Sequence, residues 1–153
     1  MFSDRMEPFF IDRLERQLQL PLPGRDAQFR MAHITRQSYN GNPPSDAKLA
    51  GVLALFYPNL RDQWHLVLIE RESHNPKDRH RGQISFPGGQ FDKADASLAH
   101  TALREAEEEI GVCASSIRLL GQLTPLYIPV SNFHVFPFVG VAEHRPAFQI
   151  QPE

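Results

Sequence analysis

The chain has 153 residues, of which 41% are hydrophobic and 22% are charged, a composition typical of a single globular domain. Its formal net charge of −2 and its lack of any apolar run near ~20 residues lead us to expect neither a nucleic-acid partner nor a membrane partner. The lone cysteine, Cys113, cannot form an internal disulfide, so we expect a reducing, cytoplasmic setting.

The first 46 residues predict a helical extension followed by a linker. Apolar residues recur at helical spacing from Pro8 to Leu20. The run from Pro21 to Gly24 must end that helix, because proline lacks the amide donor and clashes with the preceding turn. A polar, irregular stretch follows, and residues 40–44 are typical of a linker. We place the boundary near Ala47, which gives an extension over residues 1–46 and a main domain over residues 47–153.

Strand and turn signals alternate through the main domain, on both sides of one helix. The predicted strands cover residues 49–57, 65–69, 83–86, 117–123, 126–129 and 133–142. The first two form a hairpin, and Pro87-Gly88-Gly89 stops the third. Residues 96–110 predict the helix, and Gly111 is placed for a left-handed cap. Strands before and after one helix predict an α/β domain with a mixed sheet.

Glutamates near the end of that helix are the residues that most directly indicate a chemical function. Each helical residue advances by about 100°, so Glu105, Glu108 and Glu109 share one face while Glu107 points away. Like charges at this spacing repel each other, and a divalent cation would reverse the sign of that interaction. A set of carboxylate oxygens suits Mg²⁺ or Mn²⁺, and Mg²⁺ commonly shares its ligand shell with substrate phosphates. The alternative for three glutamates alone is a solvated acidic face.

The residues around these glutamates closely resemble the Nudix box. That box is a glycine, five residues, an acid, a spacer, and then Arg-Glu, two residues, Glu-Glu, one residue, a glycine and an apolar residue. Gly89, Asp95 and the run from Arg104 to Val112 match it. Asp95 replaces the usual glutamate and the spacer has eight residues instead of seven, and both departures match the coenzyme A pyrophosphatase-like branch. The resemblance implies the Nudix fold, a mixed sheet sandwiched by helices.

The same resemblance assigns roles at the site of a metal-dependent pyrophosphohydrolase. By that resemblance the metal ligands are Glu105, Glu108, Glu109 and the carbonyl of Gly89. Glu108 or Glu109 is the candidate general base, and the helical spacing does not separate a ligand from a base. Arg104 is expected to orient the glutamates by pairing with Asp95 or another acid. The alternative for Arg104 is an ordinary surface pair with Glu108.

Further segments resemble the same branch and point to coenzyme A as the substrate. They are residues 68–71 and 82–89 around a basic loop, 123–133 downstream, and 22–24 with 31–32 near the N-terminus. Coenzyme A carries a 3′-phosphate besides its diphosphate, and Arg71, Arg79 and Arg81 could supply charge-assisted contacts to these phosphates. The loop is two residues longer than the branch pattern, and the alternative for each arginine is a solvated loop charge. The expected products are 3′,5′-ADP and 4′-phosphopantetheine.

Two other functions stay open at this point. A Nudix hydrolase for another nucleoside diphosphate derivative, such as ADP-ribose, would share the same helix. A non-catalytic nucleotide-binding module would not need all three glutamates. Members of this branch usually continue past a strand near Phe148 with a helix that packs on the sheet, whereas this sequence ends at Glu153. Three alternatives stay open: the chain is truncated, the N-terminal helix covers that face, or the partner subunit of a homodimer covers it.

Overall fold

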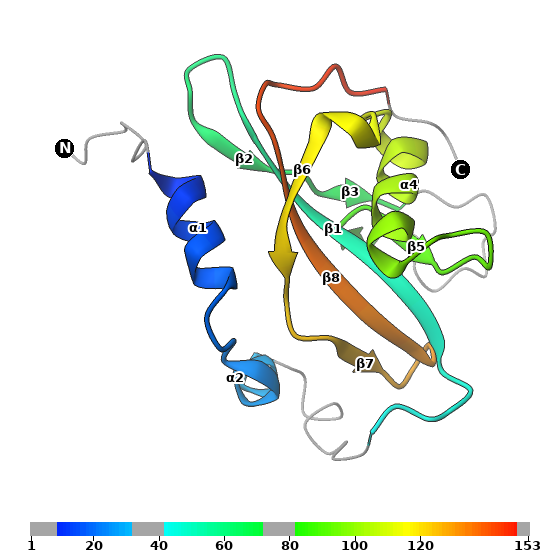
Figure 1. The fold of residues 1–153 in the computed structure, drawn as a ribbon. Coiled ribbons are helices and arrows are strands. Elements are labelled where there is room, and N and C mark those ends of the chain that lie inside the picture. The colour runs from blue at the N-terminus through cyan, green and yellow to red at the C-terminus, as the bar shows by residue number, and fades with distance from the viewer. Residues whose placement is uncertain (1–8, 32–41, 72–81, 150–153) are drawn as a thin grey trace.

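The fold is a six-stranded sheet with helices on its two faces. The computed structural model describes residues 9–31, 42–71 and 82–149. The strands are β1 (Lys48–Pro58), β2 (Trp64–Leu66), β3 (Ile69–Glu70), β4 (Ile84–Ser85), β5 (Gly88–Gln90), β6 (Ile117–Gln122), β7 (Leu126–Ile128) and β8 (Phe133–Ala142). The helices are α1 (Phe10–Leu18), α2 (Gly24–Arg30), α4 (Leu98–Ile110) and the short 3₁₀ helix η1 (Ala114–Ser116). The strand order is β2-β1-β8-β6, with β5 on β1 and β7 on β8 (Figure 1).

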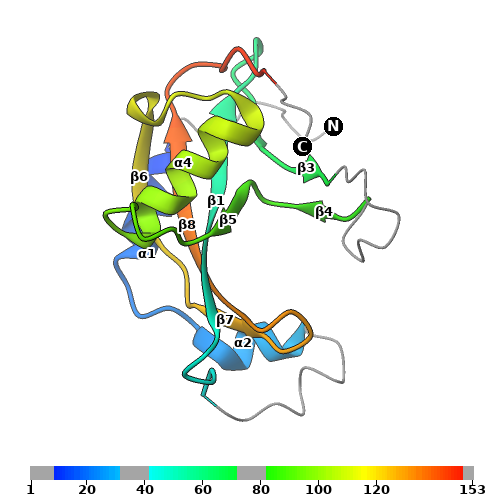
Figure 2. The same cartoon turned by 90° about the vertical axis from the view of Figure 1, so that its right-hand side faces the viewer.

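The two long strands at the centre, β1 and β8, run parallel. Their register extends from Lys48 opposite Phe133 to Phe56 opposite Val141. β2 and β5 pair antiparallel with β1, while β6 and β7 pair antiparallel with β8. The sheet is therefore mixed, as predicted. A separate antiparallel pair, β3 and β4, stands beside it (Figure 2).

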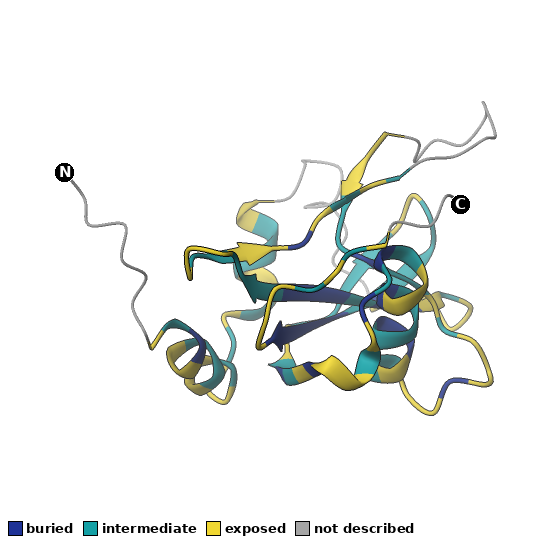
Figure 3. Ribbon diagram, turned by 90° about the horizontal axis from the view of Figure 1, so that it is seen from above, coloured by how far each residue is buried: buried dark blue, intermediate teal, exposed yellow. Residues whose placement is uncertain are grey.

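Successive residues of β1 point to opposite faces of the sheet, and both faces are covered, so the strand contributes to a core on each side. Leu53 and Leu55 pack with α4, whereas Ala54 and Phe56 pack with α1. Helix α4 packs on the first of these cores with Ala102, Ala106 and Ile110, and helix α1 packs on the second with Ile11, Leu14 and Leu18. The two helices lie on opposite sides of the sheet (Figure 1), and the buried residues follow the central strands (Figure 3). α1 therefore covers the second face of the sheet.

Helix α4 begins and ends at residues whose chemistry favours those ends. The Ser97 side chain accepts a hydrogen bond from the His100 amide at 3.1 Å, which satisfies a donor in the first turn. Gly111 adopts the predicted left-handed conformation with φ of 69°, and its amide donates to the carbonyl of Glu107 at 3.0 Å. The helix starts two residues later than predicted because Ser97 occupies its cap.

Two local predictions were wrong, and one strand was missed. The strand predicted over residues 83–86 ends before Pro87, as β4, but Gly88 and Gly89 then begin the unpredicted β5, which pairs with residues 50–52 of β1. The stretch after Gly24, predicted as irregular, contains helix α2, where the Gln28 side chain donates to the carbonyl of Thr124 at 2.7 Å. The strand predicted over residues 65–69 is divided into β2 and β3. Phe148 lies in an irregular segment, with its ring centroid 5.1 Å from that of Tyr57.

None of the described helices is long and apolar enough to cross a membrane.

Candidate active site

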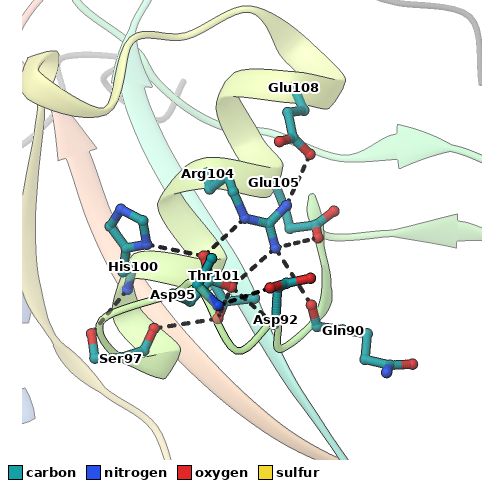
Figure 4. Close-up of polar contacts among 10 residues, drawn as sticks. Gln90, Asp92, Asp95, Ser97, His100, Thr101, Arg104, Glu105 and Glu108 are labelled. Carbon is teal, nitrogen blue, oxygen red and sulfur yellow. Dashed lines mark hydrogen bonds and ion pairs between the residues drawn. The ribbon is translucent and has the colours of Figure 1, made fainter.

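Asp95 is the buried acid of the loop that precedes α4. Its side chain is 2% exposed. The carboxylate accepts hydrogen bonds from Arg104 Nε at 2.9 Å and Nη2 at 3.1 Å, from the Thr101 hydroxyl at 2.9 Å and from the Asp92 amide at 3.1 Å (Figure 4). His100 Nδ1 lies 3.0 Å from Oδ1. The Arg104 guanidinium, followed by the Asp92 and Thr101 donors, holds the pKa of Asp95 well below its usual range, although burial opposes this shift.

Arg104 connects Asp95 to two of the predicted metal ligands. While Nε and Nη2 bind Asp95, Nη2 also lies 2.8 Å from Glu105 Oε1, and Nη1 donates to Glu108 Oε2 at 2.9 Å (Figure 4). Nη2 further donates to the Gln90 carbonyl of β5 at 3.4 Å. The structure thus contains both the predicted pair with Asp95 and the alternative pair with Glu108, because one guanidinium carries five donors in a fixed plane.

Glu105 and Glu109 lie against the two glycines of β5. A Cβ atom at Gly89 would collide with the Glu105 carboxylate, so any side chain there would displace that carboxylate from its present position. The Gly88 amide donates to Glu109 Oε2 at 2.9 Å. The predicted helical face therefore meets the sheet at β5, which explains why a Pro-Gly-Gly segment forms a strand next to this helix.

The surroundings of Glu105 disfavour its charge. Its side chain is 19% exposed, and burial raises the pKa of Glu105 even though Arg104 lowers it. Glu108 is more exposed, at 59%. Glu107 is exposed on another side of α4, where it accepts from the Ala114 amide at 3.2 Å, so the prediction that it points away from the site is confirmed.

The donors around β5 and α4 fit a hard divalent cation in their chemistry. Within the described residues no three acidic, histidine or cysteine side chains converge closely enough to hold an ion, because Arg104 holds Glu105 and Glu108 while Glu109 binds Gly88. The donor atoms are nevertheless all oxygens, and the bare backbone of Gly89 lies beside a half-buried carboxylate. A nearby cation would favour the charged form of Glu105, which burial opposes.

The predicted substrate-binding arginines are only partly described. Arg71 directly follows β3, and its backbone amide and carbonyl pair with Gln83 and Gly82 at 3.0 and 2.7 Å. Arg79 and Arg81 lie outside the described residues.

Sequence reasoning missed Thr101 and His100 as partners of Asp95. A signal existed for Thr101, because it is a polar residue one turn before Glu105 on the buried side of an amphipathic helix. His100 offered no comparable signal, since its side chain is half-exposed. The amide of Gly88 as a partner of Glu109 was also missed, because that contact depends on the pairing of β5 with β1.

Comparison with known proteins assigns the fold to a family. The model of the NUDIX domain matches residues 48–153. Two curated relatives are described as uncharacterized Nudix hydrolases NudL. The protein from Yersinia enterocolitica is 39% identical over 146 residues, covering 95% of this chain and 63% of the relative. The protein from Yersinia pestis strain Pestoides F is 50% identical over 132 residues, covering 86% of this chain and 58% of the relative. The chain thus spans about three fifths of the length of these relatives.

Solved structures support the same fold at low sequence identity. A Caenorhabditis elegans Ap4A hydrolase binary complex aligns with a TM-score of 0.55 and 16% identity, over 68% of this chain and 73% of that one. The NUDIX domain of Shewanella oneidensis NrtR, complexed with ADP ribose, aligns with a TM-score of 0.53 and 23% identity, over 80% of this chain and 78% of that one. On the family match, with the box residues gathered between β5 and α4, this chain belongs to the Nudix family.

Proposed function

We propose that this protein is a Mg²⁺- or Mn²⁺-dependent pyrophosphohydrolase that cleaves the diphosphate bond of coenzyme A or a derivative of it. The main structural support for this activity is the cluster at β5, where Glu105 lies against Gly89 and Glu109 accepts a hydrogen bond from the Gly88 amide. The names of the Yersinia relatives agree with a hydrolase and do not identify a substrate.

The metal would be held by the carboxylates of α4 and the backbone of β5. Its proposed ligands are Glu105, Glu108, Glu109 and the Gly89 carbonyl. When bound, such an ion supplies charge neutralisation at phosphate oxygens and acidifies a water molecule. Arg104 orients Glu105 and Glu108, since Nη2 and Nη1 bond these carboxylates while Nε and Nη2 bond Asp95.

In hydrolysis the oxygen of a water molecule bonds to one phosphorus, and a base must accept a proton from that water. The bond between this phosphorus and the bridging oxygen breaks, and the second phosphate leaves with the bridging oxygen. Glu108 and Glu109 are the candidate bases. They differ in their surroundings, because Glu108 is largely exposed and bound to Arg104, whereas Glu109 is partly buried and accepts from a fixed backbone amide. Both remain candidates.

The proposal of coenzyme A depends on the basic stretch of sequence between β3 and β4. The backbone of Arg71 hydrogen-bonds to Gln83 and Gly82, next to the pairing of β3 with β4. Only Phe86 and Pro87 separate β4 from β5 in the chain. This short connection supports the proposal that Arg71, Arg79 and Arg81 contact substrate phosphates next to the carboxylates. A 3′-phosphate would then distinguish coenzyme A from other diphosphates by charge-assisted contacts.

Product analysis tests the proposal. The protein is incubated with Mg²⁺ or Mn²⁺ and, separately, with coenzyme A, dephospho-coenzyme A, ADP-ribose and a nucleoside triphosphate, in water enriched in ¹⁸O. We expect coenzyme A to yield 3′,5′-ADP and 4′-phosphopantetheine, with one label in one product. The Glu109→Gln variant is the control for contaminating activity. Faster cleavage of ADP-ribose would refute the substrate, and no cleavage of any diphosphate would favour a non-catalytic module.

A further inference from the structure

Thr101 is a fully buried polar residue on the side of α4 that faces the loop of Asp95. Its exposed fraction is 0%. The hydroxyl donates to Asp95 Oδ2 at 2.9 Å, and the Ser97 carbonyl is a second acceptor at 3.3 Å (Figure 4). A hydroxyl has only one proton, so the shorter and charge-assisted contact to Asp95 is the stronger one.

Thr101 supplies Asp95 with a donor that is fully buried. A β-branched side chain on a helix has few rotamers, and burial removes water as a competing partner. His100 also contacts Asp95, but its side chain is 54% exposed and is free to turn to solvent. The Asp92 amide belongs to the same loop as Asp95. Thr101 and Arg104 are therefore the donors that tie the carboxylate to the body of the helix.

The orientation of Asp95 determines where Arg104 points. Nε and Nη2 of Arg104 both engage Asp95, which fixes the plane of the guanidinium. The remaining donors then reach Glu108 through Nη1 and Glu105 through Nη2. A rotation of the Asp95 carboxylate would turn this plane and move both contacts.

We propose that Thr101 is a positioning residue of the metal site, which acts on Glu105 and Glu108 through Asp95 and Arg104. This inference rests on the proposed function. Among the described contacts, the Thr101 hydroxyl binds Asp95 and the Ser97 carbonyl and neither glutamate, so its effect requires the two intermediate residues. Replacement of such outer partners commonly costs about 10- to 100-fold in metal affinity or activity.

Two substitutions distinguish the contribution of the Thr101 hydroxyl from that of its methyl group. Thr101→Val keeps the shape and removes the donor, whereas Thr101→Ser keeps the donor and removes the methyl. Binding of Mn²⁺ to the protein is measured by the electron paramagnetic resonance signal of the free ion, and kcat and KM for coenzyme A are measured at saturating Mn²⁺. Thermal unfolding is recorded for each variant. If Thr101→Val does not fold, Thr101→Ala repeats the test without the added apolar atom.

We expect Thr101→Val to weaken Mn²⁺ binding or lower kcat by about tenfold, with KM within about twofold and serine restoring most of the loss. Changes below about threefold in both quantities would overturn the proposal. So would an equal loss in Thr101→Ser, since that would point to packing. A wild-type protein that binds Mn²⁺ but cleaves no diphosphate would refute the proposed function alone, and the Mn²⁺ measurements would still decide the role of Thr101.

Discussion

Glu107 and Glu109 are two residues apart on α4 and lie in different surroundings. Glu109 accepts from the Gly88 amide of β5, whereas Glu107 is exposed and accepts from the Ala114 amide beyond the helix. Glu109→Gln should lower kcat by about 10²-fold or more, because it removes one anionic oxygen donor with almost no change of shape. Steady-state kinetics at saturating Mg²⁺ measure this. Glu107→Gln is the matched control, and near wild-type turnover in Glu109→Gln would contradict the site.

Asp95 should make stability depend on pH in the acidic range. Its folded-state pKa is lowered mainly by Arg104, and the unfolded value is about 3.9. A group with a lowered folded pKa stabilises the protein above its unfolded pKa, and this contribution is lost as pH falls toward the folded value. The difference in unfolding free energy between wild type and Asp95→Asn should be largest near neutral pH and shrink below about pH 4.

Urea unfolding of both proteins from pH 7 to pH 2 measures this difference. Carboxylates that do not contact Arg104 contribute to both proteins alike, so the difference reports on Asp95 and the glutamates that share Arg104 with it. A difference that stays constant as pH falls would show that Asp95 contributes through shape alone, not through its charge.

At the scale of elements, α1 should stabilise the sheet by burying one apolar stripe on it. Ile11 is 9% exposed and belongs to the same cluster as Leu120, Val139 and Val141. Ile11→Ala should lower the unfolding free energy by about 2–4 kcal/mol, because it removes buried methyl groups and leaves a cavity. Leu20 is 54% exposed just beyond the helix, so Leu20→Ala should change it by no more than about 0.5 kcal/mol.

Urea denaturation monitored at the lone tryptophan, Trp64, suits this comparison, since the ring of Phe10 in α1 lies 6.2 Å from it. Equal effects of the Ile11 and Leu20 variants would mean that α1 does not share the core of the sheet. The ion pair between Glu15 and Arg118 at 2.8 Å links the same helix to β6, but it is exposed and should add little.

The elements that sequence predicted well are those with long internal patterns. β1 and β8 are nearly continuous apolar runs of ten or more residues, and α4 buries residues at helical spacing, so their hydrophobic pattern identifies them without knowledge of neighbours. β5 has three residues and no apolar side chain, and it exists because Ala50–Val52 supply backbone partners. α2 is short and has no buried residue, so no apolar stripe marks it.

The candidate site also has some contacts that could be predicted from sequence and others that depend on tertiary packing. The pair of Arg104 with Asp95 could be expected from sequence, since both residues belong to the Nudix box. The contacts of Glu105 with Gly89 and of Glu109 with the Gly88 amide depend on how α4 packs on β5. Periodicity locates a helical face, but the groups opposite that face come from tertiary packing.

At the scale of the whole molecule, the proposed function requires that discrimination between substrates come from outside α4, because the proposed metal ligands on that helix would serve any diphosphate. The basic segment of sequence that begins at Arg71 is the candidate. If Arg79 and Arg81 meet the 3′-phosphate, replacing both with alanine should slow coenzyme A selectively and leave dephospho-coenzyme A nearly unchanged. Each lost charge-assisted contact is worth roughly 1.5–3 kcal/mol, or about ten- to a hundredfold in kcat/KM. The ratio of kcat/KM for the two substrates measures this, and equal slowing of both would place these arginines at the diphosphate or away from the ligand.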